Sequence, residues 1–171
     1  MDLTACLIQG GKILVFILTL VIIILDQASK YAAIKYLKHQ KPIVIVENFL
    51  QFNYVENRGA AFGILQGRRT LFLIITIAVV FIIAFYLFKY YYQLTPLTRI
   101  SLAMLLGGAI GNLIDRARFG YVVDFISVKL INRYDFPVFN IADICVVVST
   151  IFIVYLVLFD KLEIGDHNGF N

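Results

Sequence analysis

The sequence of 171 residues has few of the groups that carry chemistry in soluble proteins. Charged residues make up 15% of the chain, and there are only two cysteines and two histidines. Cys6 precedes the first apolar run and Cys145 lies within the last, so their positions favour neither a disulfide nor a metal site. His39 and His167 are far apart, in loop-like and tail-like sequence, which does not favour a zinc site. We therefore expect no metal and no other cofactor.

Several catalytic signatures are also absent. The chain has no Gly-x-Ser-x-Gly sequence, no phosphate-binding glycine loop and no His-Glu-x-x-His sequence. A serine–lysine peptidase needs a lysine that faces a serine, but Ser29 and Lys30 are adjacent and point from different faces of a helix. The two halves of the chain show no convincing similarity to each other, which counts against a transporter because transporters are commonly built from repeats.

What the sequence has in excess is apolar residues, at 61%. Soluble domains have roughly 45–50% apolar residues, and a chain of this length buries only about two-thirds of its surface on folding. The surplus apolar surface must therefore face lipid. The net charge is +4 and the basic residues flank the apolar segments, so we expect membrane lipids, and not nucleic acid, as a partner.

Four apolar segments are long enough to cross a bilayer, which takes about 20 residues each. We predict an all-α membrane protein with four transmembrane helices. A cleaved signal peptide is the alternative for the first segment, but no small-residue cleavage site follows it. The prediction is one integral membrane domain over residues 1–171, with spans at about 12–36, 70–88, 99–116 and 140–160 and outer loops at about 37–69 and 117–139.

The two outer loops differ in pattern. Residues 43–46 are rich in β-branched side chains, and residues 50–54 alternate apolar with polar. This is typical of strands, so we predict a small β-rich patch that lies on the membrane surface. Residues 121–136 mix apolar and polar side chains without a period, which predicts an interfacial segment, and Pro137 then stops any helix before the fourth span.

Basic residues near the spans leave the orientation open. Lys12, Lys89, Arg99 and Lys161 lie on the side of the chain ends, and the other eleven Lys and Arg residues lie toward the long loops. Counted by the positive-inside rule, this distribution places the long loops in the cytoplasm. Several of the eleven belong to the motifs described below, however, so a role in function, and not the orientation of the chain, can account for their positions.

Polar residues gather at the long-loop ends of the spans. A charged side chain at membrane depth costs about 2.5–3.5 kcal/mol and is therefore a candidate for function. Asp26 precedes Lys30 by four residues, the favourable order for a helix pair. We favour a structural clamp over direct catalysis both for this pair and for Asp115 with Arg116. The candidates are Asp26, Lys30, Asn112, Asp115, Arg116, Asp124, Asn140 and Asp143.

Asp143 and Asp124 differ from the other candidates. Asp143 has no cation three or four residues away on its own helix, and Asp124 is embedded in apolar sequence. If the two carboxyls approach each other they share a proton, because adjacent like charges do not easily both ionise. One neutral acid and one carboxylate across a water form the arrangement of aspartic proteases. A proton or ion relay in a transporter would use the same residues, and a non-enzymatic membrane scaffold is a third alternative.

Five motifs, in order along the chain, resemble those of the bacterial lipoprotein signal peptidases, also called signal peptidase II. They cover the chain from the first span to the fourth. They are Asp26-Gln27-Ala28-Ser29-Lys30, Asn57-Arg58-Gly59-Ala60-Ala61-Phe62-Gly63, Gly107-Gly108-Ala109-Ile110-Gly111-Asn112-Leu113-Ile114-Asp115-Arg116, Gly120-Tyr121-Val122-Val123-Asp124-Phe125 and Phe139-Asn140-Ile141-Ala142-Asp143.

The resemblance implies a membrane aspartic endopeptidase. Such an enzyme removes signal peptides from diacylglyceryl-modified prolipoproteins by cutting just before the lipid-modified cysteine. Asp124 and Asp143 match the catalytic pair of the family. The positions that match substrate-binding or supporting residues are Asn57, Asn112, Arg116, Asn140, Asp26, Lys30 and Asp115.

The resemblance also implies where such an enzyme works. It implies the bacterial cell (inner) membrane, with cytoplasmic chain ends and the active site on the outer face. It further implies inhibition by globomycin, a cyclic peptide antibiotic that occupies the site. We expect a monomer.

Overall fold

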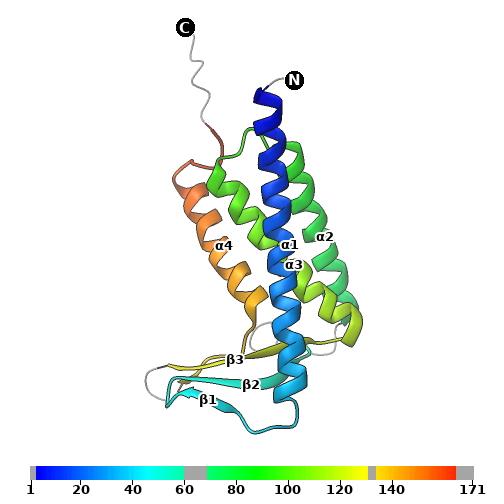
Figure 1. Cartoon of the computed structure of the whole chain (residues 1–171), viewed down its shortest axis with the longest axis vertical. Coiled ribbons are helices and arrows are strands. Elements are labelled where there is room, and N and C mark those ends of the chain that lie inside the picture. Colours follow the sequence, from blue (N-terminus) through cyan, green and yellow to red (C-terminus); the bar gives the residue numbers. More distant parts are fainter. Residues whose placement is uncertain (1–2, 60–68, 131–133, 165–171) are drawn as a thin grey trace.

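Four helices run along the long axis of the molecule, and a small sheet lies across one end (Figure 1). The computed structural model describes residues 3–59, 69–130 and 134–164. Each helix contains a stretch that is long and apolar enough to cross a membrane, which confirms the predicted four-span membrane fold. The helices are α1 (Leu3–Leu37), α2 (Arg69–Lys89), α3 (Pro96–Phe119) and α4 (Ile141–Leu158).

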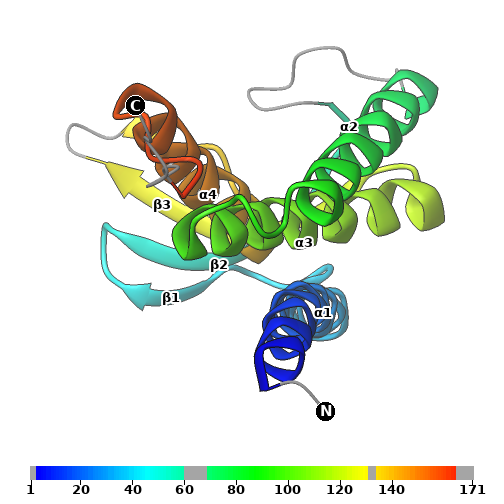
Figure 2. The ribbon, with the colours of Figure 1, turned by 90° about the horizontal axis from the view of Figure 1, so that it is seen from above.

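Helix α3 is the central helix of the bundle. It packs against α1, α2 and α4, and the view from above shows it between them (Figure 2). Its buried residues include small and polar ones, such as Ser101, Gly108 and Asn112. Helix α2 instead exposes large apolar side chains, and Phe81 is 70% exposed. Such side chains are stable only against lipid, so α2 forms an outer wall of the bundle.

Glycines bring α3 close to its neighbours. A Cβ atom added at Gly108 would lie 2.6 Å from the carbonyl oxygen of Ala142, at the start of α4. One added at Gly111 would lie 2.5 Å from a carboxylate oxygen of Asp26 on α1. Small residues let helix backbones approach closely in lipid. The glycines therefore set the distance between the elements that carry the polar candidates.

The sheet joins the two outer loops. It contains β1 (Ile43–Val46), β2 (Leu50–Asn57), β3 (Val122–Leu130) and β4 (Tyr134–Asp135), paired antiparallel in that order. Strands β1 and β2 confirm the predicted β-rich patch. The pairing of β2 with β3 places Val55 opposite Asp124 and Asn57 opposite Val122. Residues 60–63 of the second motif lie outside the described residues, as do residues 165–171.

Strand β3 occupies a segment for which the sequence shows no period. Alternation predicts a strand only where one face is buried and the other meets water. At the start of β3, Val122, Val123, Asp124 and Phe125 are all buried. Because both faces of the strand are covered here, apolar and polar residues need not alternate along it. The segment that the sequence analysis expected to be interfacial is therefore a strand of the sheet.

Replacement of Gly108 by alanine is expected to destabilise the protein by about 1–3 kcal/mol, because overpacking a tight contact forces the backbone to shift. The new Cβ would meet backbone of Ala142. Gly11→Ala is the matched control, since its Cβ would meet only the hydroxyl end of the Tyr91 side chain. Thermal unfolding in detergent should show a clearly larger fall in Tm for Gly108→Ala. Equal falls would contradict the close contact between α3 and α4.

Candidate active site

A buried lysine lies between α1 and α3 at the end of the bundle that carries the sheet. The ammonium of Lys30 lies 2.9 Å from Asp26 and 3.0 Å from Asp115, with at most 2% of any of the three side chains exposed. It also donates to the side-chain oxygen of Asn112, at 2.9 Å. Each of the three N–H donors of the ammonium thus has one acceptor. Asp115 is therefore clamped to Lys30 of α1.

The two carboxylates around Lys30 also bind backbone. Asp26 accepts the backbone N–H of Ala142 at 3.0 Å, and Asp115 accepts that of Val123 at 3.0 Å. Ala142 directly precedes Asp143, and Val123 directly precedes Asp124. The network around Lys30 therefore fixes the backbone next to each of the two predicted catalytic aspartates.

Gln27 is a member of this network that the sequence analysis did not single out as a site residue. Its side-chain amide donates to Asp115 at 3.0 Å, to Asp26 at 3.2 Å and to the carbonyl oxygen of Gly111 at 3.1 Å. A polar amide near the end of a spanning helix was the signal available in the sequence. Its two partners on α3, Gly111 and Asp115, are 84 and 88 residues away in the sequence, so the spacing of residues along one helix does not predict these contacts.

Asn140 links Asp124 to Asp143. It is the N-cap of α4: its side-chain oxygen accepts the backbone N–H of Asp143 at 2.9 Å, and its backbone N–H donates to the Asp143 carboxylate at 3.2 Å. The side-chain amide of Asn140 donates to Asp124 at 2.6 Å. Just before this cap, Phe139 pairs with Ile126 of β3, so the chain folds back and brings the two aspartates to one place.

Two further amides complete the surroundings of the pair. Asn112 of α3 donates to Asp143 at 2.8 Å, and Asn57 of β2 donates to Asp124 at 2.9 Å. The guanidinium of Arg116 lies 5.2 Å from the centre of the Phe72 ring of α2. The structure thus brings all nine predicted site residues together. They lie on α1, α3, α4 with its N-cap, and the sheet, at the end of the bundle that the sheet covers (Figure 1).

The Asp124 carboxyl is strongly perturbed by its surroundings. Burial is the main cause and the nearby charge of Asp143 the second, and together they raise the pKa of Asp124 to about 7. The hydrogen bonds from Asn57 and Asn140 act in the opposite direction, because they stabilise the ionised form. Asp124 is therefore able to hold and release a proton near neutral pH.

A cavity of about 480 Å³ opens beside the pair. Its polar end is formed by Asn57, Asn112, Arg116 and Asp143. Asp124 does not line the cavity and is 1% exposed, so it lies behind Asn57. The rest of the wall is apolar and comes from α4 and the segment before it: Phe136, Pro137, Val138, Phe139, Ile144, Val146, Val147 and Val148, with Val122 of β3. This shape suits an apolar ligand with a polar group at the aspartates.

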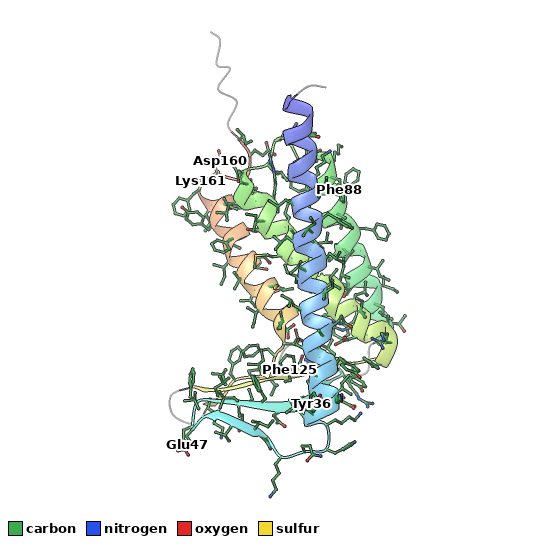
Figure 3. The ribbon with its side chains drawn as sticks, in the orientation of Figure 1. Tyr36, Glu47, Phe88, Phe125, Asp160 and Lys161 are labelled. Carbon is green, nitrogen blue, oxygen red and sulfur yellow. The ribbon has the colours of Figure 1, made fainter. Side chains whose placement is uncertain are left out.

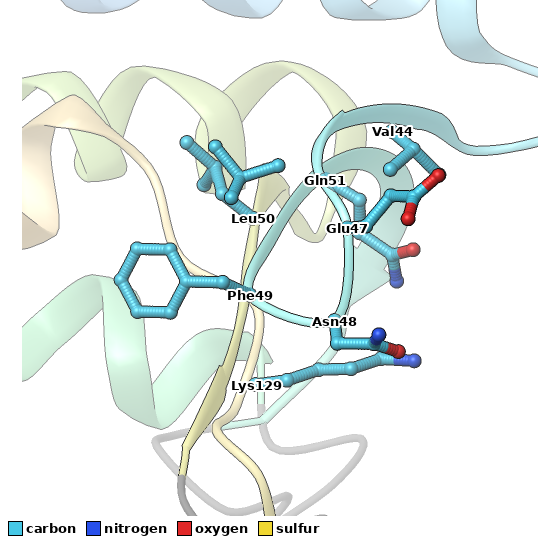
Figure 4. Close-up of a pocket in the computed structure, with 8 residues that line it drawn as sticks. Val44, Glu47, Asn48, Phe49, Leu50, Gln51 and Lys129 are labelled. Atoms are coloured by element: carbon cyan, nitrogen blue, oxygen red, sulfur yellow. The ribbon is translucent and has the colours of Figure 1, made fainter.

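A second, smaller hollow of about 230 Å³ lies at the turn between β1 and β2 (Figure 4). Its lining includes Glu47, Asn48, Gln51 and Lys129. None of the predicted site residues takes part in it. Within the described ranges no group of three or more His, Cys, Asp or Glu side chains is placed to hold a metal ion. We therefore locate the candidate active site at the larger cavity.

The chain is similar to a family of known membrane peptidases. The family model described as signal peptidase (SPase) II matches residues 18–159. A protein of Halothermothrix orenii named lipoprotein signal peptidase is 41% identical over 155 residues, which cover 90% of this chain and all of that protein. A protein of Caldanaerobacter subterraneus with the same name is 46% identical over 139 residues, covering 81% and 91% of the two chains.

Two solved structures of bacterial membrane enzymes are also similar. One has a TM-score of 0.75 at 32% identity and covers 92% of this chain and 93% of its own. The other has a TM-score of 0.75 at 35% identity and covers 85% and 93%.

Replacement of Lys30 by methionine is expected to destabilise the protein by roughly 3–5 kcal/mol, because it leaves two buried carboxylates without their cation. Lys38→Met is the matched control: Lys38 pairs with Glu56 at 3.2 Å, but its side chain is 33% exposed. Loss of such a surface pair costs about 0–1 kcal/mol. Thermal unfolding of both purified variants measures the difference. A Lys30→Met protein as stable as Lys38→Met would contradict the clamp.

Proposed function

Since the chain belongs to the signal peptidase II family and removes signal peptides from prolipoproteins, we propose that it does so as an aspartic endopeptidase through Asp124 and Asp143. The observation that carries this proposal is the bridge that Asn140 forms between the two carboxyl groups, beside a cavity with an apolar wall. The other candidate residues hold this arrangement in place or line the cavity.

In the proposed reaction the pair shares one proton. One carboxylate takes a proton from the attacking water, and the other carboxyl gives its proton to the oxygen of the scissile carbonyl. The water oxygen bonds to the carbonyl carbon to give a tetrahedral intermediate. When the C–N bond then breaks, the carboxyl that took the proton of the water gives it to the departing amine, and the other carboxylate recovers its proton from a hydroxyl of the intermediate. Asp143 faces the cavity and Asp124 lies behind Asn57, so in this proposal the water lies between the two carboxyls and reaches Asp124 past the side chain of Asn57.

The lining of the cavity supports the proposal of a lipid-modified substrate. Its apolar wall includes Ile144 and Val147 of α4, which are 42% and 56% exposed on the outside of the bundle. A substrate anchored by acyl chains can therefore enter sideways from the bilayer. We propose that the substrates carry a diacylglyceryl group on cysteine and that the cut falls just before this cysteine. Asn57 and Arg116, at the polar end, orient the peptide backbone near the pair.

We further propose that the site faces the outside of a bacterial inner membrane and that the chain ends face the cytoplasm. With four spans, both described ends lie on the side opposite the sheet (Figure 1). Prolipoproteins reach such a site after export. The positive-inside count points the other way, but Lys30 is 2% exposed and paired within the site, so it does not act as a loop cation. We propose a monomer that is inhibited by globomycin.

Asp124→Asn and Asp143→Asn are each expected to lower the cleavage rate by at least about 10²–10⁴-fold, because each removes a group that transfers a proton. A gel-shift assay in detergent with a diacylglyceryl-modified prolipoprotein, with and without globomycin, measures the rate. Asp160→Asn is the control, since Asp160 is exposed at the opposite end of the bundle (Figure 3). Cleavage at the wild-type rate by either active-site variant would rule out the aspartic pair. Failure of folded wild type to cleave would favour the ion-relay alternative.

The cleavage rate is expected to fall as the pH rises through about 7, because the pair then loses its shared proton. The hydrogen bond from Asn57 lowers the pKa of Asp124, so Asn57→Ala should move this fall to higher pH. Gln51→Ala is the control, since Gln51 of the same strand donates to Ser127 at 3.3 Å and not to Asp124. The measurement is kcat/KM against pH for all three proteins. A fall at the same pH in all three would contradict the assignment to Asp124.

A further inference from the structure

Two cations converge on one tyrosine at the end of the bundle opposite the sheet. The ammonium of Lys12 lies 5.6 Å from the centre of the Tyr91 ring and 4.5 Å from that of Tyr92. The guanidinium of Arg99 lies 4.3 Å from the Tyr91 ring. The Tyr91 side chain is almost fully buried, at 3% exposed, and packs against Gly11 of α1. Phe88, Asp160 and Lys161, labelled in Figure 3, lie at the same end.

The donors of this cluster lack acceptors. Over residues 3–59, 69–130 and 134–164, neither Lys12 nor Arg99 forms an ion pair, and the Nε–H of Arg99 is buried without a hydrogen-bond partner. This contrasts with the sheet end, where Lys30 and Lys38 both pair with carboxylates. A buried N–H group is costly unless an acceptor satisfies it, and two unpaired cations on one ring favour a nearby anion. The cluster therefore calls for an anion from outside the described chain.

The position of the cluster indicates which anion. Lys12 directly precedes the apolar run that begins at Ile13, and Arg99 lies in the first turn of the span Pro96–Phe119. The cluster is thus at the level where the spans leave the hydrocarbon, among the lipid headgroups. One turn further along α1 from Lys12, Phe16 is 63% exposed on the same face and offers an apolar surface for an acyl chain.

We propose that Lys12, Arg99 and the Tyr91 ring form a binding site for the phosphodiester of an anionic phospholipid in the adjacent leaflet. A phosphodiester has two non-bridging oxygens that share one negative charge, and these match the planar donor set of an arginine and a nearby ammonium. The ring of Tyr91 keeps both cations in place through its negative face. The site is separate from the peptidase centre and lies at the other end of the same bundle.

A carboxylate of the chain itself would be a competing occupant. Ile164, the last described residue, donates its backbone N–H to the carbonyl oxygen of Gln93 at 2.6 Å, and residues 165–171 follow it in the sequence. They include Asp166. A headgroup is present at this level at high local concentration whenever the protein is in a bilayer, which favours the lipid. A variant that ends at Ile164 separates the two occupants.

The same end provides a matched control. Lys89 lies 5.3 Å from the Phe85 ring and 5.1 Å from the Tyr90 ring, and Lys161 lies 5.6 Å from Tyr155 and 5.9 Å from Phe159. Each of these lysines lies over rings that no second cation approaches in the described structure. A Lys89→Gln, Lys161→Gln double variant removes the same number of charges as Lys12→Gln, Arg99→Gln but leaves the cluster intact.

The test measures retention of dioleoyl-phosphatidylglycerol and of dioleoyl-phosphatidylcholine by the purified full chain in detergent, by native mass spectrometry. We expect wild type to retain phosphatidylglycerol preferentially and Lys12→Gln, Arg99→Gln to bind it about tenfold more weakly or worse. The Lys89→Gln, Lys161→Gln protein should behave like wild type. Unchanged peptidase activity in detergent shows that both double variants are folded.

Three outcomes would overturn the proposal. Equal losses in the two double variants would show diffuse attraction between charges and headgroups, without a site. Equal retention of the two lipids by wild type would show that the cluster does not select an anion. Retention of phosphatidylglycerol that appears only after removal of residues 165–171 would show that the chain end occupies the cluster.

Discussion

The buried ammonium of Lys30 is the interaction on which the site end of the molecule depends. A cation without water is stable only when acceptors replace its hydration shell, and Asp26, Asp115 and Asn112 do so. Fixed in this way, the two carboxylates also accept backbone N–H groups. Asp26 accepts that of Ala142 with its other oxygen, and Asp115 accepts that of Val123 with the oxygen that binds Lys30. The position of each catalytic candidate is thus a consequence of charge neutralisation on α1.

The molecule separates a rigid polar end from an apolar surface that meets lipid. Glycines of α3 allow α1 and α4 to approach, so the amides and carboxylates from three helices and the sheet reach one another. Beyond this network the cavity wall is made of valine, isoleucine, proline and phenylalanine. Under the proposed function, a substrate with acyl chains and a peptide bond would meet both surfaces at once, and water would be available to aspartates that lie near helix ends.

How far the sequence predicts this arrangement depends on the range of each contact. The four spans, β1 and β2 follow from apolar length and alternation, which are local properties. The gathering of polar residues at one end follows from where they fall within the spans. The sequence does not predict that β3 is a strand, because the start of β3 is covered on both faces and its residues do not alternate. It also does not predict that Lys30 pairs with Asp115 or which residues Gln27 contacts, because these partners are distant in sequence. The separation of Asp124 from Asp143 was open for the same reason, and the pairing of Ile126 with Phe139 accounts for their approach.

The pairing of β2 with β3 has a consequence for biogenesis. The two strands lie on the same side of the bundle, but α2 and α3 come between them in the chain. Asn57 is therefore synthesised long before Asp124, its hydrogen-bond partner, exists. The helical hairpin of α2 and α3 has to cross the bilayer and return before the strands meet, and α4 must follow to supply Asp143. A nascent chain that stalls at any earlier point lacks one of these residues, so the proposed site is assembled only when α4 is in place.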